Sequence, residues 1–172
     1  GAGMLEAALT LNFTALSAGH AVSPEQFEPN IPVEKQAMHH EIDFTLVNVE
    51  LSLGYALASW VTLEARIPYR TAHTEARFLD IDEQPIENFE SIHHRTETIS
   101  GLGDIGFGAR FRLLPPGLID GLMLFGTAGV STPTGGTRPN PFALGREGKR
   151  HQHIFFGTGT FDPYGTLAMS YM

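Results

Sequence analysis

Gly101-Leu102-Gly103-Asp104-Ile105-Gly106-Phe107-Gly108-Ala109-Arg110-Phe111-Arg112-Leu113-Leu114 opens the stretch of sequence that decides the fold. A segment rich in Pro, Gly and Asp follows at residues 115–121, and a second apolar run fills residues 122–130. In the first run apolar and polar residues alternate with a period of two, which is typical of a β-strand with one apolar face. Two such runs around a turn predict a β-hairpin.

The same alternation recurs in residues 5–16, 42–57 and 61–70. In the second of these runs the apolar phase changes at Leu46-Val47, which predicts either a β-bulge or a switch from a loop extension to a membrane wall. Pro68 cannot donate a hydrogen bond, so we expect it near a strand end. Trp60 and Tyr69 lie at opposite ends of the third run, as expected of interfacial aromatic girdles. Residues 151–172 are expected to hold a strand, a turn at Asp162-Pro163-Tyr164-Gly165, and the start of a further strand.

The connections between these runs alternate in length. They are expected at residues 17–41, 58–59, 71–100, 115–121, 133–150 and 162–165, in the order long, short, long, short, long, short. Such alternation places all long loops at one end of an up-and-down meander, as in bacterial outer-membrane barrels. We therefore expect residues 1–172 to form a single all-β domain, an antiparallel up-and-down transmembrane β-barrel. A Greek-key sandwich would give no reason for this alternation.

Charged residues fall on the polar face of the expected strands, interleaved with Gly, Ser and Thr. Six of them are predicted to line a pore: Glu50, Glu64, Arg66, Arg70, Arg110 and Arg112. Arg66 and Arg110 are expected side by side on neighbouring strands, where they would concentrate positive charge on one wall. Because a lipid-facing charge costs about 2–4 kcal/mol at the bilayer midplane, the apolar face is expected to carry none.

Composition excludes several kinds of partner. The net charge of −8 argues against nucleic acid, and the absence of cysteine excludes disulfides and thiolate metal sites. No apolar run approaches the roughly 20 residues of a membrane helix. Residues 1–4 lack the basic region of a signal peptide, so a signal is expected to have been removed or to lie outside this sequence.

Three clusters of residues are candidates for chemical sites. The histidines occur as His39-His40, His93-His94 and His151-x-His153, beside the long loops, where they could bind a transition metal. Polar rim residues are the favoured interpretation, with His151, His153, His93 and His94 as weaker metal candidates. The acidic residues 80–90 lack the glycine-containing calcium loop, and residues 101–108 lack the helix and lysine of a phosphate loop. We therefore predict no cofactor and no catalytic site.

Three segments resemble one known family. Gly101-Leu102-Gly103-Asp104-Ile105, Pro115-Pro116-Gly117 and residues 157–163 are similar to the outer-membrane family named for the MetA pathway of phenol degradation. This family is itself similar in outline to hydrocarbon and fatty-acid channels. The resemblance runs from about residue 42 onward and implies a barrel in the bacterial outer membrane, monomeric or loosely associated, in contact with lipid bilayer and lipopolysaccharide. Family chains are longer.

About seven strands are predicted, and the sequence ends inside the last of them. Single-chain barrels normally have an even number of strands. The barrel is thus expected to be closed by missing C-terminal strands or by another chain, and missing residues are favoured. The leading functional hypothesis is a passive, porin-like channel for small molecules, apolar or aromatic ones among them. The alternatives are a non-transporting barrel that serves as a scaffold or binds a protein partner, and a soluble β-sandwich binding module.

Overall fold

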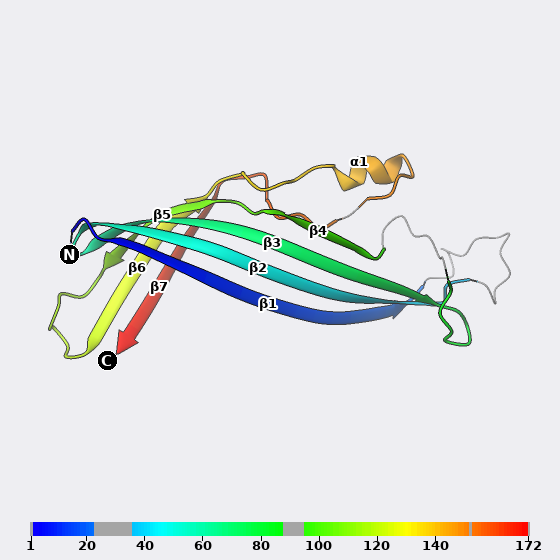
Figure 1. The fold of residues 1–172 in the computed structure, drawn as a ribbon, viewed down its shortest axis with the longest axis horizontal. Helices are drawn as coiled ribbons and strands as arrows, with labels where there is room; N and C mark the ends of the chain where they lie inside the picture. The colour runs from blue at the N-terminus through cyan, green and yellow to red at the C-terminus, as the bar shows by residue number, and fades with distance from the viewer. Residues whose placement is uncertain (1, 23–35, 88–94, 152, 172) are drawn as a thin grey trace.

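The protein forms one antiparallel sheet in a computed structural model that describes residues 2–22, 36–87, 95–151 and 153–171. Neighbouring strands follow the order β1-β2-β3-β5-β6-β7, and β4 pairs with β3 outside this path (Figure 1). The strands are β1 (Leu5–Ala21), β2 (His39–Ala58), β3 (Val61–Leu79), β4 (Glu97–Leu102), β5 (Gly106–Arg112), β6 (Leu122–Ser131) and β7 (Asp162–Tyr171). A short helix, α1 (Pro141–Arg146), lies between β6 and β7.

The sheet is curved like half of a barrel. Glu6 on β1 and Arg110 on β5 approach to 2.6 Å although β2 and β3 lie between their strands. The face that carries both side chains is therefore concave. On β1, β2, β3 and β5 this concave face consists of the even-numbered residues, and the odd-numbered residues form the convex face.

Strand β3 continues to Leu79, so the prediction that Pro68 lies near a strand end is wrong. The neighbouring strand is interrupted instead: residues 103–105 separate β4 from β5, and both pair with β3. The Gly103 N–H donates to the Pro68 carbonyl over 2.9 Å, so the backbone of Pro68 faces this interruption. A missing N–H is tolerated there because no regular ladder partner lies opposite it.

Strand β2 has no bulge where its sequence changes phase. Its pairing with β3 runs in one register from His39 to Ala56, and the only shift lies between Ala56 and Ala58. The bulge expected at Leu46-Val47 is therefore wrong. The change of phase is a change in which face of a continuous strand is apolar.

The turn predicted at Asp162-Pro163-Tyr164-Gly165 is also wrong. These four residues begin β7 and pair with residues 128–131 of β6, whereas the described part of residues 151–161 forms no strand. Pro163 is tolerated because β7 is an edge strand of the sheet. The Asp162 carboxylate, which would have initiated the turn, accepts hydrogen bonds from Thr158 Oγ1 and Thr160 Oγ1 over 2.6 and 2.8 Å. With β4 and β5 counted as one interrupted strand, five connections remain, at residues 22–38, 59–60, 80–96, 113–121 and 132–161, and these still alternate in length.

The described residues bury almost no apolar core. Their buried apolar side chains are Ala37, Ala56, Ala72 and Leu79, and none of the large apolar residues is fully buried. They form one layer without the second, facing sheet of a sandwich. No helix within these ranges is long and apolar enough to cross a membrane.

Candidate functional site: the charged concave face

All six residues predicted to line a pore belong to one face of the sheet. Glu50 on β2, three residues of β3 and two of β5 occupy even-numbered positions, and the ladder pairs of β2, β3 and β5 place these positions on the concave face. The β3 residues are Glu64, Arg66 and Arg70, and the β5 residues are Arg110 and Arg112. The sequence therefore predicted which face is charged, because in a strand successive side chains point to opposite faces and each position belongs to one of the two.

One row of directly paired residues crosses the whole concave face, and we call it the central row. From β1 to β7 it consists of Glu6, Gly54, Glu64, Gly108, Gly129 and Tyr164. Its three glycines leave space that the larger side chains of the row enter. A Cβ atom at Gly54 would lie 3.4 Å from Glu6 Oε2, and one at Gly129 would lie 2.4 Å from Tyr164 Cζ. Side chains from both edges of the sheet therefore lean inward over glycine.

Ion pairs join the two sides of this row. Arg110 Nη2 donates to Glu6 Oε2 over 2.6 Å, and Arg110 Nε lies 3.1 Å from Glu64 Oε1. Arg66 Nη2 lies 3.6 Å from the other carboxylate oxygen of Glu64. Acids and bases thus alternate through Glu6, Arg110, Glu64 and Arg66.

The expected concentration of positive charge is therefore wrong. Arg66 and Arg110 do lie on adjacent strands, but Arg66 pairs with Gly106 and Arg110 pairs with Thr62. Glu64 lies two residues before Arg66 on β3, and its carboxylate lies between the guanidinium groups of Arg66 and Arg110 and contacts both. A hollow of about 430 Å³ lies beside this network, and its walls include Glu6, Glu50, Glu64, Arg66 and Arg110.

Arg70 and Arg112 lie on either side of the network. Arg70 Nε donates to Asn48 Oδ1 over 3.1 Å, and its Nη1 donates to the Phe156 carbonyl over 3.4 Å. Arg112 Nε donates to the Leu114 carbonyl over 3.1 Å, close to the β5–β6 connection. Both guanidinium groups therefore contact backbone of connecting segments, unlike Arg66 and Arg110.

The β6–β7 connection is fixed to the interruption between β4 and β5. Asp104 in this interruption accepts from the backbone N–H of Gly135 over 2.8 Å and from that of Thr158 over 2.7 Å. The Thr158 hydroxyl lies 2.9 Å from the same carboxylate. Both ends of the connection are therefore held by one side chain, a contact that alternation alone could not reveal.

Polarity along the strands inverts on both faces. The convex face is apolar in β1 up to Ala15, in β2 from Val47 to Leu57, and in β3 from Val61 to Tyr69, and we call these stretches the convex apolar band. Beyond the band most convex residues are polar or charged, and the exceptions, Gly19, Ala21 and Leu79, lie at the far ends of β1 and β3. The polar or charged ones are Ser17, His39, Glu41, Asp43, Thr45, Thr71, His73, Glu75 and Arg77. On the concave face, Leu46, Phe44 and Ile42 follow Asn48 and Glu50.

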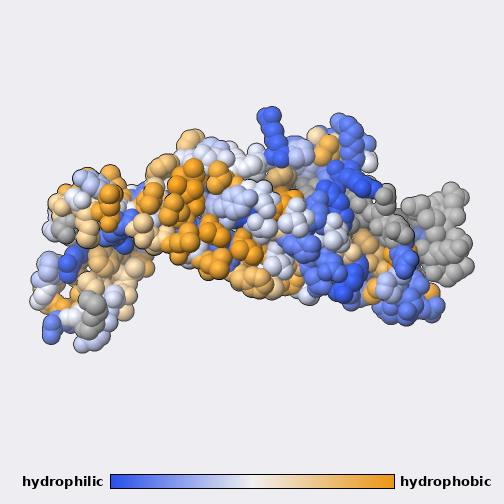
Figure 2. All heavy atoms as spheres, in the orientation of Figure 1, coloured by the Kyte–Doolittle hydropathy of each residue, from blue (hydrophilic) through white to orange (hydrophobic). Residues whose placement is uncertain are grey.

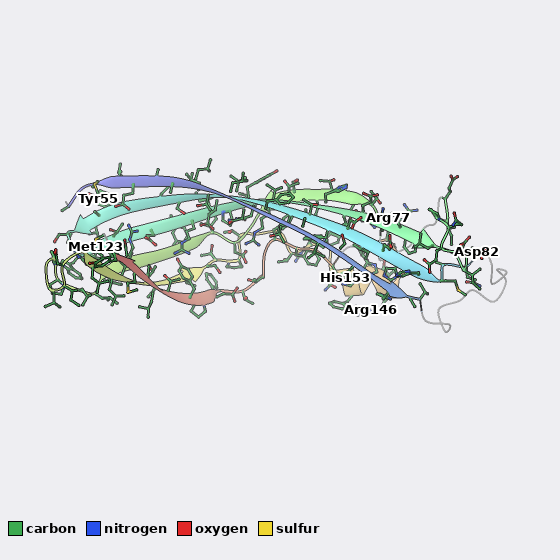
Figure 3. The ribbon with its side chains drawn as sticks, turned by 90° about the horizontal axis from the view of Figure 1, so that it is seen from below. Tyr55, Arg77, Asp82, Met123, Arg146 and His153 are labelled. Carbon is green, nitrogen blue, oxygen red and sulfur yellow. The ribbon has the colours of Figure 1, made fainter. Side chains whose placement is uncertain are left out.

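The inversion occurs at one level of the sheet. Ala15 pairs with Thr45, two residues from Val47, and Tyr69 pairs with Val49, also two residues from Val47. The last apolar convex residues of the three strands therefore lie within two residues of one level. Figure 2 shows apolar surface gathered over the half of the sheet nearer the N-terminus and hydrophilic surface toward the other end. Figure 3 places Tyr55 and Met123 at the more apolar end of the sheet, and Arg77 and Asp82 at the hydrophilic end.

The described histidines do not form a site of three ligands. Among the described residues no group of three or more His, Cys, Asp or Glu could hold a metal ion. The His151 and His153 ring centroids lie 5.0 Å apart in a segment that is not a strand, and His93 and His94 lie outside the described residues. His39 lies on the convex face and His40 on the concave face, as predicted for adjacent strand residues. The ring centroids of His20 and His40 lie 3.9 Å apart, a contact that alternation along the strands does not predict.

No family model matches this chain, and no curated protein or solved structure is significantly similar to it. The resemblance to the phenol-degradation outer-membrane family therefore stays a prediction.

Proposed function

We propose that this sheet is part of the wall of a transmembrane β-barrel in the bacterial outer membrane, and that its concave face lines a path for passive diffusion of small molecules. The observation that carries the proposal is the inversion of polarity at one level of the sheet. A strand that crosses a bilayer and continues into water should be apolar outside only over the bilayer. In a soluble antiparallel sheet with one face on the core, the apolar face is expected to stay on the same side along each strand.

The length of the convex apolar band supports this proposal. At about 3.3 Å per residue, the ten steps from Val47 to Leu57 cover roughly 33 Å along the strand. A tilt of about 40° reduces that length to about 25 Å along the membrane normal, the height of the lipid-facing band of outer-membrane barrels. The exposed large side chains of the band include Leu9 at 73% and Phe13 at 68%. Lipid contact would cover them, whereas water would leave them unfavourably hydrated.

The charges on the concave face suggest how a permeant would be selected. Acids and bases that alternate across a narrow lumen orient water and bias the sign of an ion that passes, because the low dielectric of the wall strengthens each charge. The wall faces a hydrated path, since lipid contact with Glu64, Arg66 and Arg110 would be costly.

Conductance in planar lipid bilayers tests the proposal. The reconstituted protein should conduct, and the double substitution Arg66→Gln with Arg110→Gln should shift the reversal potential toward cation selectivity. The same strand content by circular dichroism would show that the variant folds. Arg77→Gln is the matched control, because Arg77 lies on the convex face beyond the band, where it pairs with Asp43. Folded protein without conductance would support the scaffold alternative, and an unchanged reversal potential would contradict the lining role.

A further inference from the structure

Tyr164 lies flat against the concave face in a furrow made of glycine. Its ring reaches from β7 across Gly129 on β6 to Gly108 on β5, where an added Cβ atom would lie 2.8 Å from its hydroxyl oxygen. A Cβ atom at Gly129 would lie 2.4 Å from Cζ of the ring. Glycine at positions 108 and 129 is therefore what lets the ring lie this close to the backbone.

The other side of the ring faces Arg66. The Arg66 Cζ atom lies 5.0 Å from the Tyr164 ring centroid, within the range of a cation–π contact. The ion pair of Arg66 with Glu64 is loose, at 3.6 Å. Two supports therefore hold this guanidinium over the central row, and Tyr164 is the one whose own position is fixed by packing.

The tyrosine hydroxyl plays no part in this arrangement. The Tyr164 Oη atom is buried and has no hydrogen-bond partner among the residues that the structure describes. Leaving a buried hydroxyl without a partner is unfavourable, so the flat position must be held by contacts of the ring itself. Phenylalanine should then occupy the same furrow and support Arg66 equally well.

We propose that Tyr164 is a positioning residue that fixes the Arg66 guanidinium over the central row and thereby sets the charge selectivity of the lumen. The inference rests on the proposed function, because selectivity requires a conducting lumen. It assigns a role to an uncharged residue of β7 that neither lies next to Arg66 in the sheet nor pairs with its strand.

Reversal potentials of Tyr164 variants test this role. We expect Tyr164→Ala to lower the anion-over-cation permeability ratio and Tyr164→Phe to leave it unchanged. Adding Tyr164→Ala to Arg66→Gln should cause no further change, because the two residues then act through one contact. If Tyr164→Ala lowered the permeability ratio by the same factor in the parent protein and in Arg66→Gln, the proposal would be overturned. A loss of selectivity in Tyr164→Phe would also overturn it.

A chemical readout separates this inference from the proposed function. Phenylglyoxal should modify Arg66 about two- to fivefold faster in Tyr164→Ala than in the parent protein, which is the factor that corresponds to a cation–π pair at an exposed site. The rates for Tyr164→Phe and the parent should be equal, and Arg77 serves as the internal reference. If the protein does not conduct, the proposed function fails while this comparison still decides the contact. An unchanged Arg66 rate in Tyr164→Ala would overturn it.

Discussion

Glu64 is the residue on which the charge balance of the concave face depends. It contacts both Arg66 and Arg110 and separates their positive charges. Its side chain is 15% exposed, whereas those of its two partners are about a third exposed. A change at this carboxylate should therefore alter the electrostatic field at the concave face more than a change at either arginine alone.

Neutralising Glu64 should make the lumen more selective for anions. In Glu64→Gln two arginines lose their shared counter-charge, so the reversal potential should move in the direction opposite to that of Arg66→Gln with Arg110→Gln. The shift should shrink as the salt concentration rises, because mobile ions screen charges in a hydrated lumen. Glu75→Gln is the control on the convex face and should have no effect. A shift toward cations in Glu64→Gln would contradict the arrangement of charges.

Single residues were predicted unequally well from the sequence. The period of two assigned Glu50, Glu64 and Arg110 to one face, because face depends only on position along a strand. It could not assign Glu6 or Tyr164 to the same network. Glu6 reaches Arg110 through the curvature of the sheet, and Tyr164 reaches Arg66 across two other strands. Curvature and the register of distant strands are not encoded in local alternation.

At the scale of elements, local sequence patterns predicted the wrong secondary structure where contacts with distant parts of the chain decided it. Asp-Pro-x-Gly at residues 162–165 favours a turn, yet Thr158 and Thr160 bind the carboxylate and the segment pairs with β6 as an edge strand. Pro68 argues against a strand interior, yet the interruption at residues 103–105 lies opposite it. The polar stretch at residues 133–150 was expected to be a loop but contains α1, which Asn140 caps through hydrogen bonds from Phe142 N and Ala143 N.

The β6–β7 connection should loosen when Asp104 is removed. Asp104→Ala deletes the acceptor for the N–H groups of Gly135 and Thr158, and hydrogen bonds to a charged acceptor contribute about 1.5–3 kcal/mol each. Trypsin should therefore cleave after Arg146 or Lys149 at least about tenfold faster, since a factor of ten corresponds to about 1.4 kcal/mol. Asp120→Ala, an exposed aspartate of the β5–β6 connection, should leave the rate unchanged. Equal cleavage of the Asp104→Ala and parent proteins would show that other contacts hold the connection.

At the scale of the whole molecule, the sequence predicted an antiparallel all-β architecture, and the structure confirms it as a curved single sheet. Strands that follow one another along the chain lie side by side in the sheet, with β4 and β5 sharing the place of one strand. The connections between them alternate in length even without the predicted last turn. The inversion of polarity extends over β1, β2 and β3, so it is a property of the sheet and not of one strand. The proposed membrane location and the proposed pore rest on that property.

Accessibility of single cysteines along β2 tests the central claim most directly. The chain has no cysteine of its own, so each introduced thiol reports on one position without background. In proteoliposomes we expect a water-soluble maleimide to label Ser52→Cys but not Leu51→Cys or Leu53→Cys, and a lipid-soluble maleimide to show the reverse. Beyond the inversion, Asp43→Cys on the same convex face should react with the water-soluble reagent. Equal labelling of Leu51→Cys, Ser52→Cys and Leu53→Cys by the water-soluble maleimide would contradict a membrane wall.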